Sequence, residues 1–315
     1  MHGWCGKILR VDLSLGKVAS EPLDPRVARE YIGGRGFGIY YLRQEVDPAC
    51  DPLGPANKII MAAGPLTGTA APTGARYVVT TKSPLTGAIT CSNSGGNFPA
   101  ELKKSGHDAL IIEGASAQPV YLWIDGDRAE LRPAEHLWGK TTHEADDALR
   151  GETHEKAKTA VIGPAGEKRV LFAAIMNDRD SAAGRAGVGA VMGAKKLKAV
   201  VVRGEGEVAL ADPAAFKAAN AKYRDDFKAK TRVNPPALRT HGTAITSVGT
   251  QAHGVFPTRN FQQGTFEGWE AIGGEELTKK YLVRAKPCFS CPIACGRVTR
   301  VPDGPFQGEG EGPEY

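Results

Sequence analysis

Long apolar runs are missing from this sequence. No stretch approaches the roughly 20 consecutive apolar residues that span a bilayer, so no membrane partner is predicted. The N-terminus, MHGWCGKILRVDLSLGK, has no basic region followed by an apolar stretch and a small-residue cleavage site. No secretory leader is therefore predicted, and we expect a cytoplasmic protein.

A concentrated positive charge is also missing. The formal net charge is +5, and the basic residues are spread along the chain without interleaved aromatic residues. Nucleic acid is therefore not a predicted partner. A mild positive balance suits phosphate-bearing cofactors or an acidic redox partner, and it is equally ordinary for a chain of 315 residues.

Several common catalytic patterns are absent as well. The pairs His143-Glu144 and His154-Glu155 are isolated and do not form H-E-x-x-H, and no Ser/His/Asp arrangement is readable. The segment GVGAVMG, with Glu205 downstream, resembles a dinucleotide fingerprint. Its spacing is G-x-G-x-x-x-G, and ten residues separate Gly187 from the preceding strand, so a Rossmann site is not predicted.

What is present predicts an α+β protein of about two domains. Hydrophobic residues make up 41% and charged residues 24%, as in ordinary globular proteins. Short runs rich in β-branched and aromatic residues recur without regular helical spacers, which disfavours a doubly wound parallel sheet. These runs are KILRVDL, KIIMAAG, RYVVTT, DALIIEG, PVYLWIDG, TAVIGP, VLFAAI and LKAVVVRG.

Helices are predicted at fewer places. They are Pro25 to Tyr31, FPAELKKSG, and THEADDALR with Thr142 as its N-cap. After Asp212-Pro213 the composition becomes helical and strand patterns are sparse. We therefore predict a β-rich domain over residues 1–208 and the start of a mainly helical domain over residues 209–315.

Four glycine-rich loops lie in the predicted first domain. They are GGRGFG (Gly33 to Gly38), GPLTGTAAPTGAR (Gly64 to Arg76), CSNSGG (Cys91 to Gly96) and AAGRAGVGAVMG (Ala182 to Gly193). Glycine lets backbone amides approach a ligand closely, and consecutive amides bind anions. A single loop of this kind is usually a tight turn. Four of them, which include Arg76, Arg185 and Asn93, favour phosphate binding.

Three of the six cysteines lie within eight residues, in CFSCPIAC. The spacing C-x2-C-x3-C, of Cys288, Cys291 and Cys295, favours iron–sulfur ligation. A zinc site or structural thiols stay open, although no second ligand pair follows for zinc. A [4Fe-4S] cluster needs a fourth thiolate, and the other thiols here are Cys5, Cys50 and Cys91.

Three segments resemble the tungsten-containing aldehyde ferredoxin oxidoreductases. They are NSGGNFPAELKKSGHDALIIEG, MNDRDSAAGRAGVGAVMGAKKLKAVVVRG and PCFSCPIACGR, and both GKILRVDLSLGKV and YIGGRGFG fit too. The resemblance covers residues 1–315. It implies a first domain of two β-sheets that forms a base for two pyranopterins, whose dithiolenes hold tungsten or molybdenum.

The resemblance also implies roles for particular residues. The pterin phosphates would be held by Arg76, Asn93, Gly95, Gly96, Arg185, Ala186 and Gly187. The carbonyls of Asn93 and Ala186 would reach a magnesium ion between the phosphates. Cys288, Cys291 and Cys295 would bind a [4Fe-4S] cluster. Members oxidise aldehydes to carboxylic acids and pass electrons to ferredoxin or a ferredoxin-like iron–sulfur subunit, within a homo- or hetero-oligomer.

The chain stops at Tyr315, near half the family's usual length. The resemblance therefore places the fourth cluster cysteine and two pterin-binding motifs on further chain, with Cys91 as the alternative ligand. Glu314 matches an acidic residue near the metal and is the candidate catalytic residue. Two other interpretations stay open: a related tungsten subunit of a benzoyl-CoA type reductase, and a non-catalytic iron–sulfur electron-transfer module.

Overall fold

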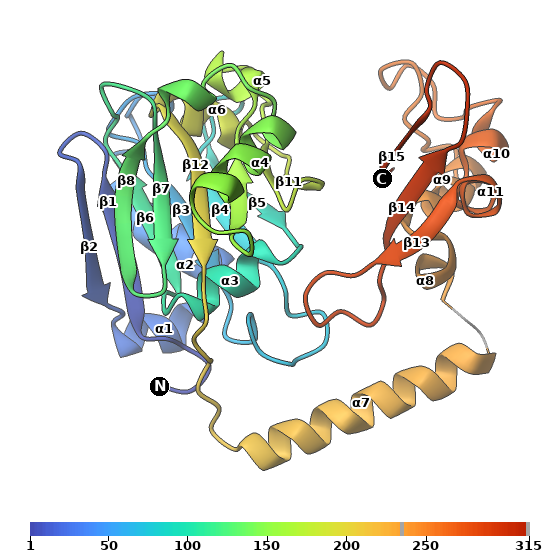
Figure 1. Cartoon of the computed structure of the whole chain (residues 1–315), viewed down its shortest axis with the longest axis horizontal. Coiled ribbons are helices and arrows are strands. Elements are labelled where there is room, and N and C mark those ends of the chain that lie inside the picture. The colour runs from blue at the N-terminus through green and yellow to red at the C-terminus, as the bar shows by residue number, and fades with distance from the viewer. Residues whose placement is uncertain (234–235, 313–315) are drawn as a thin grey trace. The chain divides into compact units, whose positions relative to one another are not determined.

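The chain divides into two compact units, Met1–Pro213 and Ala214–Tyr315. A computed structural model describes residues 1–233 and 236–312 (Figure 1). The domain ranges expected from the sequence, 1–208 and 209–315, stay a prediction. Across the described residues, no helix has both the length and the apolar character needed to cross a membrane.

The first unit contains two six-stranded sheets. One has the order β2-β1-β6-β3-β4-β5, formed by β1 (Lys7–Asp12), β2 (Lys17–Pro22), β3 (Ile59–Ala63), β4 (Tyr77–Lys82), β5 (Ile89–Ser94) and β6 (Ala109–Glu113). The other has the order β11-β10-β9-β12-β7-β8, formed by β7 (Val120–Asp125), β8 (Arg128–Pro133), β9 (Lys158–Val161), β10 (Ile175–Asn177), β11 (Ser181–Ala183) and β12 (Leu197–Arg203). The pairs β1–β6 and β7–β12 are parallel and the other neighbours are antiparallel. The predicted α+β class is confirmed.

The main core lies between the two sheets. Successive residues of a strand point to opposite faces, so in β3 the side chains of Ile59 and Met61 enter the central core while Ile60 and Ala62 face outward to helices. Helices α3 (Phe98–Lys104) and α6 (Val188–Ala194) place apolar side chains in the central core with both sheets. They are therefore wedged between the sheets.

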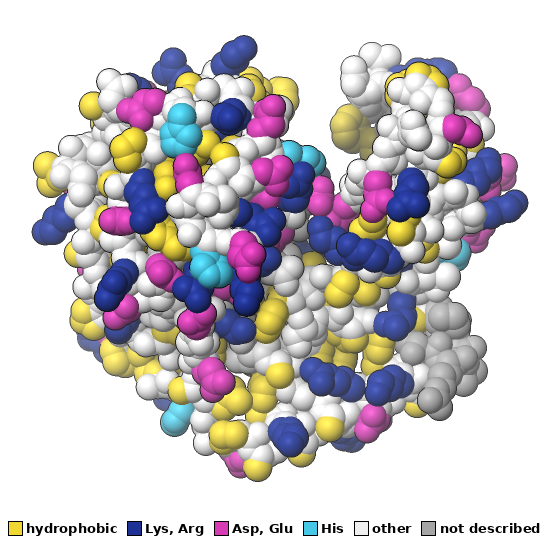
Figure 2. All heavy atoms as spheres, in the orientation of Figure 1, with side chains coloured by type: hydrophobic (Ala, Val, Ile, Leu, Met, Phe, Trp, Pro, Cys, Tyr) yellow, Lys and Arg dark blue, Asp and Glu magenta, His cyan; other side chains and the backbone are white. Residues whose placement is uncertain are grey.

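The outer faces of both sheets are covered. Helices α1 (Pro25–Tyr31) and α2 (Arg35–Glu45) pack on the first sheet. Helix α4 (Thr142–Glu152) and the 3-10 turn η1 (Glu135–Leu137) pack on the second, and the short α5 (Pro164–Glu167) contacts α6. On the face in view, Lys and Arg side chains are interspersed with Asp and Glu over this unit (Figure 2).

One local expectation is wrong, and one predicted loop is partly helical. Within the segment GGRGFG, Arg35 to Gly38 form the first turn of α2, and a phosphate role for this segment stays a prediction. A Cβ on Gly38 would lie 2.0 Å from Thr80 Oγ1, so this glycine serves close helix–sheet packing. The N-cap of α4 is Thr141 and not Thr142, because Thr141 and Glu144 form a reciprocal capping box.

The second unit is helical with a small sheet. Its elements are α7 (Pro213–Val233), α8 (Ala237–His241), η2 (Thr243–Ile245), α9 (Thr246–Ala252), α10 (Trp269–Ile272), α11 (Gly274–Lys280), β13 (Leu282–Lys286), β14 (Gly296–Val301) and β15 (Gly308–Glu311). The last three form an antiparallel sheet in the order β13-β14-β15. This sheet was not predicted. Its strands are short, and charged residues or glycines interrupt their apolar pattern.

Candidate cofactor sites

The first candidate loops lie at one end of the β4–β5 hairpin. Arg76 immediately precedes β4, and β4 pairs with β5 so that Tyr77 faces Ser94. This register brings Arg76 next to Asn93, and the Arg76 Nη1 donates a hydrogen bond to Asn93 Oδ1 at 2.7 Å. Both side chains are exposed. Two residues predicted from distant parts of the sequence are thus in direct contact.

The loop with Arg185 rests on the same hairpin. The backbone N–H of Arg185 donates to Ser92 Oγ at 3.0 Å. The hydroxyl of Ser83 donates to the Ala186 carbonyl at 2.8 Å. The structure therefore brings the predicted Arg76, Asn93 and Arg185 segments together at one edge of the first unit. Ser83 and Ser92 hold them there, and sequence reasoning gave neither a role.

The backbone at Ala186 and Gly187 is left-handed, with φ of 60° and 73°. Gly187 is required here, since a Cβ would lie 2.0 Å from the Leu171 carbonyl oxygen. Tight turns that contain left-handed residues can direct neighbouring N–H groups toward one side, as in anion-binding concavities. With an exposed arginine at position 185, this geometry suits a phosphate.

A carboxylate braces the Gly95–Gly96 segment from within. Asp178 Oδ2 accepts hydrogen bonds from the backbone N–H groups of Asn97 at 2.6 Å and Phe98 at 2.8 Å, where α3 begins. Asn177 Nδ2 donates to the Gly95 carbonyl at 2.9 Å. The NDRD sequence carried no signal for this bracing role, which depends on the turn between β10 and β11 meeting α3.

The same carboxylate affects a buried phenol. Burial raises the pKa of Tyr77 well above its usual value, and the nearby Asp178 adds to the shift. Tyr77 therefore stays protonated, and its OH donates to Asn177 Oδ1 at 3.4 Å. The interior behind the loops thus contains a protonated phenol at Tyr77, while the exposed arginines lie on the outer side.

The residues of this edge fit the predicted phosphates and magnesium in kind. Arg76 and Arg185 supply guanidinium groups that can pair with phosphate oxygens in two-point fashion. The Ala186 carbonyl already accepts from Ser83, but a carbonyl oxygen has two lone pairs and can bind a cation with the second. These ligand assignments, including those of Asn93, Gly95, Gly96 and Gly187, stay predictions.

The cysteine loop connects β13 and β14 in the second unit. Cys288, Cys291 and Cys295 are all half-buried, and the Cys291 N–H donates to the Cys288 carbonyl at 3.1 Å. Ser290 and Ala294, directly before two of the cysteines, have φ of 55° and 50°. Such left-handed residues form the backbone concavities found at anion and iron–sulfur sites.

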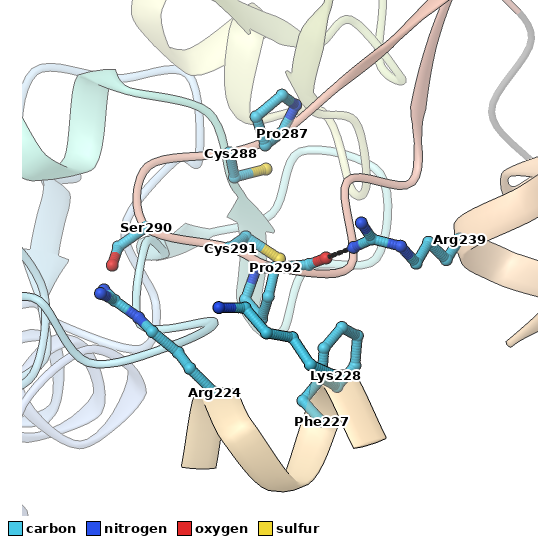
Figure 3. A pocket seen from close by; sticks show the side chains of 9 residues that line it. All are labelled: Arg224, Phe227, Lys228, Arg239, Pro287, Cys288, Ser290, Cys291 and Pro292. Carbon is cyan, nitrogen blue, oxygen red and sulfur yellow. Dashed lines mark hydrogen bonds between the residues drawn. The ribbon is translucent and has the colours of Figure 1, made fainter. Parts of the chain in front are cut away.

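A basic pocket of about 390 Å³ lies against this loop. Cys288 and Cys291 line it, and the side chains of Arg224 and Lys228 extend from α7 toward the loop (Figure 3). Arg239 Nη1 donates to the Pro292 carbonyl. The pocket therefore combines thiols with cationic groups, which suits an anionic metal–sulfur group.

The thiols do not form a closed metal site by themselves. Across the described part of the chain, no three His, Cys, Asp or Glu side chains are grouped so that they could bind one metal ion. The donor type, loop conformation and basic pocket fit a cluster, while the ligand roles of the three cysteines stay predictions. Glu314, the candidate catalytic residue, lies outside the described residues.

Comparison with known families gives a match for each unit. The model of the aldehyde ferredoxin oxidoreductase N-terminal domain matches residues 8–204, and the model of domains 2 and 3 matches residues 218–315. The chain belongs to the aldehyde ferredoxin oxidoreductase family. The predicted resemblance is thereby confirmed.

Individual aldehyde ferredoxin oxidoreductases align with the whole chain. The tungsten-containing aldehyde ferredoxin oxidoreductase of Pyrococcus abyssi (strain GE5 / Orsay) is 51% identical over 316 residues, which cover 100% of this chain and 51% of that protein. The enzyme of the same name from Thermococcus kodakarensis is 51% identical over 319 residues, covering 100% and 52%. The chain thus spans about half the length of these relatives.

A solved structure has the same fold. It is the active site complex BamBC of benzoyl coenzyme A reductase in complex with 1,5-dienoyl-CoA. The match has a TM-score of 0.83 and 34% sequence identity, and it covers 96% of this chain and 48% of the other. The family's architecture is therefore shared by proteins whose names indicate different substrates.

Proposed function

We propose that the chain forms part of a tungsten bis-pyranopterin enzyme that oxidises aldehydes to carboxylic acids. Electrons leave through a [4Fe-4S] cluster to ferredoxin or a ferredoxin-like iron–sulfur subunit. The main support is the 51% identity to tungsten-containing aldehyde ferredoxin oxidoreductases along the entire chain. Phosphate-type loops and a cysteine loop on one chain also agree with this combination of cofactors.

In this proposal the first unit orients the cofactor through its phosphates. Arg76 and Arg185 neutralise them, and the left-handed backbone at Ala186 and Gly187 supplies N–H groups. The contact between Arg76 and Asn93 fixes the guanidinium before a ligand arrives. When bound, the metal centre, tungsten or molybdenum, supplies the redox chemistry. The protein's share is positioning and electrostatic stabilisation.

The cysteine loop has the electron-transfer role in this proposal. Cys288, Cys291 and Cys295 provide three thiolates, and the basic pocket offsets part of the negative charge that they carry as ligands. Glu314 stays the candidate catalytic residue. A homo- or hetero-oligomeric assembly is compatible with this proposal.

A reductase of the benzoyl-CoA type is the second candidate function. The fold match to the BamBC complex favours it, with a TM-score of 0.83. The lower identity, 34% against 51%, makes aldehyde oxidation the better supported reaction. A non-catalytic electron-transfer module is disfavoured, because it would not need the N-terminal domain that matches over residues 8–204.

Substitution of Arg185 tests the phosphate role. Arg185→Ala removes a charge-assisted bond worth about 1.5–3 kcal/mol, so pterin and tungsten content should fall in the anaerobically purified full-length enzyme. Arg128→Ala, at an exposed arginine on β8, is the matched control and should keep the cofactor. Full pterin and tungsten occupancy in Arg185→Ala would count against the proposal.

Substitution of Cys291 tests the cluster separately. Cys291→Ala should lose or convert the cluster, which electron paramagnetic resonance and iron analysis can detect. In the full-length enzyme, aldehyde oxidation with an artificial dye should survive better than electron transfer to the physiological acceptor. An unchanged cluster signal would remove Cys291 from the ligand set.

A further inference from the structure

Arg297 is an unusual buried cation in the second unit. It lies at the start of β14, two residues after Cys295, and only 2% of its surface is exposed. It is among the largest fully buried side chains of the described chain. Burying a guanidinium is costly unless its charge and its N–H groups find partners.

The hydrogen bonds of Arg297 go to backbone carbonyls around the cysteine loop. Its Nη1 donates to Ala294 at 2.8 Å and to Gly296 at 3.0 Å, the residues on either side of Cys295. Its Nη2 donates to Leu238 at 3.0 Å and to Arg239 at 2.5 Å, in α8. The guanidinium therefore fastens the third cysteine's segment to a helix.

These bonds satisfy Nη1 and Nη2 of Arg297 but do not balance its positive charge. Arg297 forms no ion pair with a carboxylate among residues 1–233 and 236–312, and its Nε is buried without a hydrogen-bond partner. By contrast, the buried Lys103 on the same chain is paired with Asp108. A buried charge with no carboxylate partner among the described residues points to an anionic ligand beside it.

We infer that Arg297 is the buried counter-charge of the anionic metal–sulfur cluster held by the cysteine loop, and that it positions Cys295. This inference rests on the proposed cluster and deepens it. Thiolates and their cluster carry net negative charge, and the adjacent loop is their site. Arg297 does not ligate the metal. It acts by holding the cysteine loop in place and by its positive charge.

A fixed positive charge beside a cluster favours the reduced form, which is the more negative one. Cluster potentials depend on net charge and on the surrounding hydrogen bonds. Arg297→Gln removes the charge and keeps a hydrogen-bonding amide. It should make one-electron reduction about tenfold less favourable, which corresponds to a potential about 59 mV more negative.

Two further variants separate charge from bracing. Arg297→Lys keeps the charge but loses the fork of donors, so its potential should stay near that of the wild type while iron content falls. Arg300→Gln, on the same strand, removes an exposed arginine that pairs with Glu309, and it is the control for general charge. Its potential and iron content should not change.

The experiment measures iron and sulfide per chain, the potential by electron paramagnetic resonance titration, and the melting temperature with and without the cluster. If Arg297 is a counter-charge, Arg297→Gln should lower the cluster potential. The variant should also destabilise the cluster-containing protein more than the metal-free protein. If Arg297→Gln does not load, a metal-free melting temperature near that of the wild type supports the inference, because the fold is intact.

Two results would overturn the inference, and they differ from each other. In the first, the wild type contains iron but Arg297→Gln leaves the cluster potential unchanged, or lowers the melting temperature equally with and without the cluster. Arg297 would then be a structural brace only. No iron in the anaerobically prepared wild-type full-length enzyme would refute the proposed cluster itself, and the counter-charge with it.

Discussion

At the residue scale, buried ionisable groups in this protein are stabilised in different ways. Lys195 is 1% exposed and its Nζ donates to the carbonyls of Gly114 at 2.8 Å and Pro55 at 3.3 Å. Burial lowers the pKa of Lys195 to about 8. The pKa of Cys5 shifts in the opposite direction for the same reason, since burial raises the pKa of its thiol to about 11. In each case desolvation favours the neutral form.

His107 should make the first unit sensitive to acid. It is 1% exposed, its ring nitrogens lie 3.1 Å from Ser20 Oγ and 3.2 Å from Ser105 Oγ, and burial lowers its pKa from 6.5 to about 4. Between these values the unfolded chain binds the proton and the folded chain does not, so stability falls as pH decreases from 6.5 to 4. The loss amounts to about 3 kcal/mol and is complete near pH 4.

Chemical denaturation followed by tryptophan fluorescence between pH 7 and pH 4 checks this. His107→Gln should flatten the pH dependence in that window, and His253→Gln, at an exposed histidine, should not. An equally steep loss of unfolding free energy in His107→Gln would assign the acid sensitivity to other groups.

The sequence suggested some candidate site residues and not others for a physical reason. Arg185 and the cysteines could be predicted because their chemistry and spacing are local in the sequence. Asp178 and Arg297 could not, because their roles depend on which distant carbonyl or N–H group the fold brings to them. In the sequence alone, a charged residue that will be buried cannot be distinguished from one that will be solvated.

At the scale of elements, buried strands were predictable and edge strands were not. Runs such as KIIMAAG contain β3, whose five residues are all buried. The missed strands β2 and β5 carry polar residues and are largely exposed or half-buried, so their apolar pattern is weak. The run VLFAAI was predicted as a strand, but β10 begins only at its last residue, Ile175. Leu171 and Phe172, earlier in the run, are exposed.

The N-cap of α4 gives a prediction at this scale. Thr141 Oγ1 accepts from the Glu144 N–H at 3.3 Å, and Glu144 Oε2 accepts from the Thr141 N–H at 2.8 Å. Thr141→Ala should therefore lower the free energy of unfolding by about 0.5–2 kcal/mol in chemical denaturation. Thr142→Ala changes the same residue type one position later and should cost less. A larger loss from Thr142→Ala would contradict the observed cap.

At the scale of the whole molecule, the chain carries candidate cofactor sites on two units and spans about half the length of its relatives. A protein of residues 1–315 alone is expected to be inactive toward aldehydes, to hold little tungsten and to carry at most a labile cluster. Three thiolates leave one iron open to water and oxidation, since a [4Fe-4S] cluster takes four.

Anaerobic preparation of that protein, with iron, sulfide and tungsten measured per chain, checks the expectation. Cys91→Ser is the informative variant, because Cys91 is the alternative fourth ligand. About four irons in an air-stable cluster, abolished by Cys91→Ser, would show that residues 1–315 complete the ligand set. Loss of iron on exposure to air, unaffected by Cys91→Ser, is the expected outcome.

The wedged helices α3 and α6 have a consequence for how the enzyme matures. Each follows directly after a loop of the candidate phosphate site, and each is anchored in the core between the two sheets. The loops of the candidate site are therefore held by the core between the sheets. In the proposed enzyme, cofactor binding would then be a docking step onto a polypeptide that has already folded.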